Sequence, residues 1–119
     1  FIQAVMNIIT NAKDALLINK TNEDCKLIII SLKKRDNDVS LCIQDNAGGI
    51  PNEVISKIFE PYFTTKHKSQ GTGIGLYMTH QIITEHMGGE IKVTNKTFEH
   101  NNITYKGAKF TIKFKTINN

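Results

Sequence analysis

The sequence predicts an α+β domain, a two-layer sandwich in which helices cover one face of a mixed, mostly antiparallel sheet. Two observations predict this class. Helical periodicity appears in a segment at the start of the chain and in another past its middle, whereas the remaining apolar residues alternate in short strand-like runs. Runs joined by short turns favour antiparallel pairing, and a helix with one apolar face needs a second layer to cover it.

The first half of the chain predicts one helix and a pair of strands. Residues 1–17 have helical period, and a polar loop follows at 19–24. Strand-like runs at 26–32 and 39–45 flank a charged turn at 33–38. Apolar and polar residues alternate in the second run, so one side of that strand is expected to be buried. The apolar face of the helix would comprise Phe1, Val5, Ile8, Ile9, Ala12 and Leu16.

The second half predicts a short helix, a loop, a longer helix and further strands. Pro51 opens a helical segment that extends to Ile58, and the polar stretch 60–70 indicates an irregular, mobile loop. A helix is expected at about 74–86, ended by Gly88-Gly89. Its side chains available for burial are Leu76, Met78, Ile82 and Ile83. Two or three strands are expected at 90–95, 103–105 and 109–115.

Length and composition limit the class of protein. A chain of 119 residues with 39% apolar and 22% charged residues is typical of one globular domain. No apolar run approaches the ~20 residues that span a bilayer, and the first residues of the sequence lack a signal-peptide pattern. Because the chain begins inside a helical pattern, we interpret residues 1–119 as one domain of a longer protein. Cys25 and Cys42 lack C-x-x-C spacing, which favours reduced thiols in a cytoplasmic domain.

A polar stripe runs along the first helix, where Gln3, Asn7, Asn11 and Asp14 recur about one turn apart. A solvated face is one explanation, although asparagine is a poor helix former. Two asparagines one turn apart also offer carbonyl oxygens to Mg²⁺ and amides to phosphate oxygens. The stripe alone leaves both explanations open.

Two further segments suit a nucleotide. Asp45 ends a strand and precedes Asn46-Ala47-Gly48-Gly49, where small residues let a flat ligand approach and the carboxylate can accept from an exocyclic amine. A plain turn is the alternative. Gly71-Thr72-Gly73-Ile74-Gly75 precedes a helix, so its N–H groups can face phosphate oxygens, although a flexible hinge is equally compatible. Neither a Walker P-loop nor a Rossmann fingerprint is present.

In this order, the segments resemble the catalytic domain of sensor histidine kinases, within the superfamily shared with gyrase, heat-shock chaperone ATPases and mismatch-repair ATPases. The resemblance covers nearly the whole chain and includes the later segment 86–91. It implies the Bergerat ATP-binding fold. Four blocks match: the N box at 7–12, the G1 box at 45–50, the F box at 58–66 and the G2 box at 71–76.

The resemblance implies ATP and Mg²⁺ as ligands. Asn11, with Asn7 beside it, would hold Mg²⁺ against the ATP phosphates. Asp45 would accept the adenine amino group, with Gly49 admitting the base, and residues 60–70 would form an ATP lid. The other residues implicated are Phe59 and Phe63 as lid anchors, Lys66 as a phosphate contact, and Gly71, Thr72, Gly73, Gly75 and Leu76 in the glycine-rich block.

The resemblance also implies how the reaction is divided between domains. No histidine here has the surroundings of the family's phosphoacceptor, so the acceptor is expected on a separate dimerisation domain, and a response regulator receiver domain as a further partner. The parent protein is then expected to be a homodimer, with this piece monomeric and unable to autophosphorylate alone. Gyrase-like enzymes orient water with a carboxylate where this chain has Asn7, which favours transfer to a partner over hydrolysis. Ala47 departs from the family, which usually has glycine there.

Three other functions compete with this interpretation. An ATPase or protein-serine kinase of the same superfamily is disfavoured by the F box and by residues 88–91. A nucleotide sensor without catalysis would share the site but not the transfer. A nucleic-acid binder is disfavoured because the lysines lack interleaved aromatic residues, so no nucleic-acid partner is expected.

Overall fold

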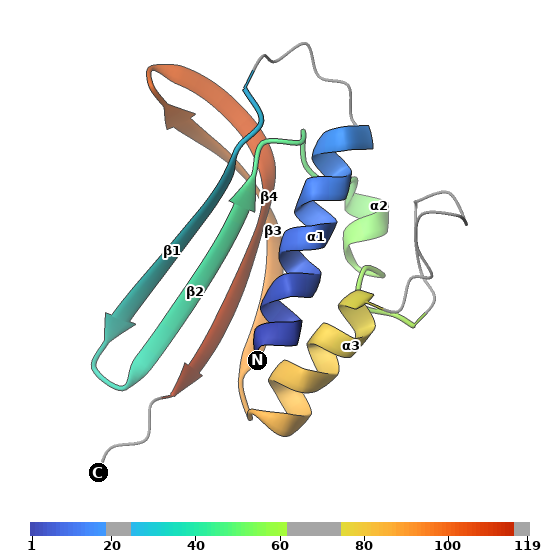
Figure 1. The fold of residues 1–119 in the computed structure, drawn as a ribbon, viewed down its shortest axis with the longest axis vertical. Helices are drawn as coiled ribbons and strands as arrows, with labels where there is room; N and C mark the ends of the chain where they lie inside the picture. Colours follow the sequence, from blue (N-terminus) through green and yellow to red (C-terminus); the bar gives the residue numbers. More distant parts are fainter. Residues whose placement is uncertain (19–24, 62–74, 116–119) are drawn as a thin grey trace.

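The computed structural model describes residues 1–18, 25–61 and 75–115, and these residues form two layers (Figure 1). A four-stranded sheet makes one layer, and the helices lie against one of its faces, as the α+β class predicted. The elements in chain order are α1 (Ile2–Ile18), β1 (Ile28–Arg35), β2 (Asp38–Asp45), α2 (Asn52–Ile55), α3 (Gly75–Gln81), the π-helical turn η1 (Ile82–His86), β3 (Glu90–His100) and β4 (Ile103–Lys115).

The strands lie in the order β1-β2-β4-β3, and each described pairing is antiparallel. Arg35 pairs directly with Asp38, so a two-residue turn replaces the longer turn predicted at 33–38. Backbone groups make the ladder whatever the side chains are, so the charged residues of 33–35 continue β1. A second two-residue turn, at Asn101 and Asn102 with φ values of 52° and 66°, joins β3 to β4.

The last part of the sheet is longer than predicted. β3 extends to His100, and β4 runs unbroken where two strands, at 103–105 and 109–115, were predicted. The prediction failed at residues 106–108, where Lys106 and Gly107 interrupt the apolar alternation. The β3–β4 hairpin therefore extends past the end of β2 (Figure 1).

The hydrophobic core lies between the sheet and the helices. Ile8 of α1 and Ile43 of β2 are almost completely buried there, as the predicted apolar faces require. Phe1 departs from the prediction, since it is 46% exposed at the helix start and packs edge-on against Phe114. The core as a whole comprises Ala4, Ile8, Leu41, Ile43, Ile58, Ile83, Ile91, Ala108, Phe110 and Ile112.

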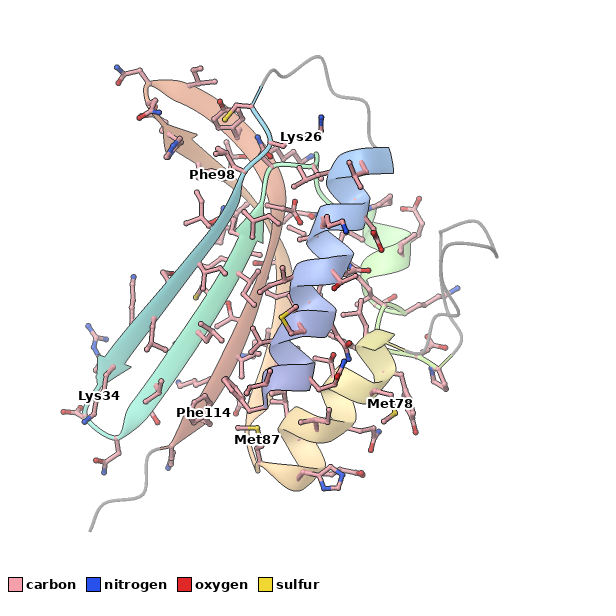
Figure 2. All side chains as sticks on the ribbon, in the orientation of Figure 1. Lys26, Lys34, Met78, Met87, Phe98 and Phe114 are labelled. Carbon is pink, nitrogen blue, oxygen red and sulfur yellow. The ribbon has the colours of Figure 1, made fainter. Side chains whose placement is uncertain are left out.

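The helix predicted at 74–86 is present as α3 followed by η1, in which Met87 N bonds to Ile82 O. Met78 was predicted to be available for burial, and this was wrong: it is 46% exposed and projects from the side of α3 turned away from the sheet (Figure 2). At about 100° per residue Met78 lies roughly 160° around the helix from Leu76. Thr79, the next residue, is completely buried, and its hydroxyl donates to Gly75 O.

Two smaller findings complete the fold. The short helix predicted from Pro51 to Ile58 is reduced to α2, with Pro51 directly before it and turns after it. No helix in the described part of the chain is both long and apolar enough to cross a membrane.

Candidate nucleotide-binding site

Asp45 lies at the C-terminal end of β2 and is only 4% exposed. Its Oδ1 accepts the N–H of Ala47 at 3.0 Å, which is the local turn expected of an aspartate, and also the N–H of Ala108 at 3.2 Å, from β4. Burial raises the pKa of Asp45, and the two N–H groups oppose that rise. A desolvated carboxylate of this kind gains from a further hydrogen-bond donor.

Gly107 of β4 passes directly against Asp45. A Cβ added at Gly107 would lie 1.6 Å from Asp45 O and 2.8 Å from Asp45 Oδ1, so no other residue fits without moving β4. Gly107 was not among the predicted site residues. An isolated glycine within a strand pattern signals a close backbone approach, and that signal was available.

The turn after Asp45 is made by Gly48 and Gly49, with φ values of 99° and 92° that favour glycine. Gly48 N donates to Lys106 O at 2.9 Å. A Cβ at Gly49 would lie 2.9 Å from Asn95 Oδ1, so packing against Asn95 also requires glycine here. Asn95 in turn bonds both backbone groups of Ile50, and nothing in the local sequence of β3 predicted this contact.

Asn46 follows Asp45 directly, and no separate role was predicted for it. Its side chain is buried, accepts the N–H of Leu27 at 2.8 Å and donates to Cys25 O at 2.8 Å. It therefore joins the end of β2 to the chain that enters β1. Its role is to hold the strand end that presents Asp45.

The asparagine stripe of α1 meets the start of α3. Asn7 Nδ2 donates to Gly75 O at 3.2 Å, across 68 residues of sequence, while Asn7 Oδ1 accepts from Gln3 Nε2 at 2.8 Å. Asn11 lies one turn further along the same helix and is half-buried. The N-box helix and the last glycine of the G2 block are therefore neighbours.

Two of the remaining predicted site residues pack against the core. Phe59 lies 5.3 Å from His80 and 6.3 Å from Phe110 between ring centroids, and Leu76 contacts the same core. The described segments contain no cluster of three His, Cys, Asp or Glu side chains that could hold a metal. Five predicted residues lie outside the described residues: Phe63, Lys66, Gly71, Thr72 and Gly73.

Comparison with known proteins shows the family of this chain. A family model described as histidine kinase-, DNA gyrase B-, and HSP90-like ATPase matches residues 1–118. The two-component sensor PprA of Pseudomonas aeruginosa is 37% identical over 95 residues, which are 79% of this chain and 10% of that protein. Sensor histidine kinase ZraS of Escherichia coli O157:H7 is 32% identical over 110 residues, 92% of this chain and 20% of that protein.

Solved structures with a similar fold include a histidine kinase domain. The catalytic domain of histidine kinase ThkA superimposes with a TM-score of 0.73 at 29% identity, covering 96% of this chain and 65% of that one. The chain belongs to the histidine kinase-, DNA gyrase B- and HSP90-like ATPase family, as the ATPase domain of a two-component sensor histidine kinase. It spans only 10% and 20% of the length of PprA and ZraS.

Proposed function

We propose that this domain binds Mg-ATP and transfers the γ-phosphoryl group to a histidine on a separate dimerisation domain of its parent protein. The observation that carries the proposal is Asp45, a buried carboxylate held by two backbone amides beside a turn of two glycines. The parent would act as a homodimer and pass the phosphoryl group on to the receiver domain of a response regulator. We expect the isolated domain to be monomeric and to work in the cytoplasm, where ATP is available.

Asp45 would recognise the adenine. Both hydrogen bonds from Ala47 and Ala108 reach Oδ1, so we assign Oδ2 to the exocyclic amine of the base. The positive-φ turn at Gly48 and Gly49 presents backbone without side chains next to that carboxylate, where a flat ring can lie. A base with a carbonyl in place of the amine would oppose the carboxylate, which would exclude guanine.

Asn11 and Asn7 would serve the phosphate end. The Oδ1 of Asn7 already accepts from Gln3, so Asn11 is the metal ligand we favour, and Asn7 would join it by exchanging that partner. When bound, Mg²⁺ would neutralise charge on the phosphate oxygens. Gly75 lies next to Asn7, and the amides of Gly71, Thr72 and Gly73, with Lys66, would complete the site.

The transfer itself would depend on positioning rather than on covalent chemistry by this domain. The site would hold the γ-phosphorus in line with the attacking imidazole nitrogen of the partner histidine, so that the P–N bond forms as the bond to the β,γ-bridging oxygen breaks and ADP leaves. Asn7 is an amide and a far poorer base than a carboxylate, so it would not activate water for hydrolysis. Phe59, packed between His80 and Phe110, would anchor one end of the lid at 60–70, and Phe63 would be the second anchor.

The experiment combines the purified domain, γ-labelled ATP and the histidine-bearing domain of the parent protein. We expect acid-labile label on the added domain only when Mg²⁺ and both domains are present, and none on this domain alone. The matched controls are Asp45→Asn in this domain and replacement of the acceptor histidine by alanine in the other. Release of free phosphate without labelling of the acceptor would refute the proposal.

A further inference from the structure

Asn95 of β3 makes a two-bond contact with a backbone unit 45 residues earlier in the chain. Its Oδ1 accepts the N–H of Ile50 and its Nδ2 donates to Ile50 O, both at 2.7 Å. An asparagine amide that satisfies both groups of one residue holds that residue's backbone in a single orientation. Asn95 is half-buried, on the sheet face that carries the helices, and pairs with Ala108 in the strand register.

The segment that Asn95 holds is the glycine turn beside Asp45. Gly49 passes so close that an added Cβ would lie 2.9 Å from Asn95 Oδ1 and 3.2 Å from Asn95 Cγ. Gly48 N is fixed separately by Lys106 O. Two successive glycines have many accessible conformations, and these anchors select one of them before any ligand arrives.

The geometry points to Asn95 as a positioning residue for adenine recognition, which holds the turn from Gly48 to Ile50 in the conformation that admits the base. The inference rests on the proposed function, in which Asp45 and this turn receive adenine. Asn95 does not touch the ligand in this account. It lowers the entropy that the turn would otherwise lose on binding.

If Asn95 only stabilised the fold, its removal would lower nucleotide affinity no more than the loss of stability explains. Ile91 of β3 belongs to the hydrophobic core and Val93 packs against it, whereas the side-chain amide of Asn95 bonds the N–H and the carbonyl oxygen of Ile50. Removing the Asn95 amide should therefore loosen the turn more than the core. Loss of nucleotide affinity should then exceed what loss of stability explains, and it should fall on the adenine end of the ligand.

The test compares Asn95→Ala with the unaltered domain, using calorimetric titration of Mg-ATP and competition by Mg-GTP. We expect Asn95→Ala to raise the Kd for Mg-ATP about tenfold, equivalent to about 1.4 kcal/mol, and to reduce the preference for ATP over GTP. Asn95→Ser, whose hydroxyl can replace one of the two bonds, should recover part of the affinity. The matched control is Gln44→Ala, because Gln44 is a half-buried amide on the opposite face of the sheet. The Kd of this variant for Mg-ATP should stay within about twofold of that of the unaltered domain.

Urea unfolding of each variant separates folding from binding. If the unaltered domain binds Mg-ATP and Asn95→Ala binds equally well, the inference is wrong while the proposed function stands. Equal weakening of ATP and GTP with unchanged selectivity would assign Asn95 a structural role only and would also overturn it. If the unaltered domain takes up no Mg-ATP, the proposed function fails first. Should Asn95→Ala not fold, the selectivity of Asn95→Ser decides in the same way.

Discussion

Replacement of Gly107 by alanine is the perturbation whose effect the structure specifies most closely. The new Cβ would lie 1.6 Å from Asp45 O and 2.4 Å from Asp45 C, both backbone atoms that cannot rotate away. β4 must therefore separate from the end of β2. That movement loses the hydrogen bonds Gly48 N to Lys106 O and Ala108 N to Asp45 Oδ1.

The size of the effect follows from these losses. Overpacking costs about 1–3 kcal/mol, and each of the two lost hydrogen bonds costs a further ~1 kcal/mol, so the unfolding free energy is expected to fall by at least about 3 kcal/mol. At an m value of about 1.5 kcal/mol/M, the urea midpoint should fall by about 2 M. The matched control is Gly75→Ala, where an added Cβ meets nothing within 4 Å and the midpoint should hold or rise. A Gly107→Ala midpoint within about 0.5 M of the unaltered domain would refute the reasoning.

Three further outcomes are expected. Asn46→Ala should lower the unfolding free energy by about 2 kcal/mol, because Leu27 N and Cys25 O both lose a partner at 2.8 Å; an unchanged urea midpoint would contradict this. Acid should weaken Mg-ATP binding at a higher pH than an ordinary aspartate would cause, because burial raises the pKa of Asp45 and a proton on Oδ2 would take the position assigned to the amine; the Kd measured as pH falls checks this. Urea unfolding over the same pH range follows the contribution of Asp45 to stability. This contribution should be complete below the pKa that Asp45 has in the unfolded chain, and it should decline as pH rises through the higher pKa that Asp45 has in the folded domain. An Asp45→Asn domain should lack this decline.

Much of the fold was accessible from periodicity. The spacing of Ile8, Ala12 and Leu16 placed α1, and the alternation around Ile43 placed β2 with the correct buried side. The errors arose where tertiary contacts override local pattern. The prediction divided β4 near Gly107, because glycine at this position is required by the close approach of Asp45, 62 positions earlier, and not by the neighbouring residues of the strand.

Only the part of the site that has a local sequence pattern could be predicted. Asp45 and the glycines after it stood out because a carboxylate at a strand end next to small residues is a local pattern. Asn95 and Asn46 did not, because each bonds backbone groups far away in the sequence and their own surroundings are ordinary for a strand or a turn. Asn7 was found as part of a stripe, but its contact with Gly75 depends on how α1 and α3 pack.

The central claim is that Asp45 reads the adenine of a magnesium-bound nucleotide, and calorimetric titration of Asp45→Asn tests it most directly. An asparagine Oδ1 can still accept the N–H groups of Ala47 and Ala108, so the variant should remain folded, whereas its NH₂ group would face the amine of the base. We expect magnesium-dependent ATP binding by the unaltered domain and a Kd raised about tenfold to a hundredfold in the variant, as loss of a charged hydrogen bond implies. Equal ATP affinity in the two folded proteins would contradict the account.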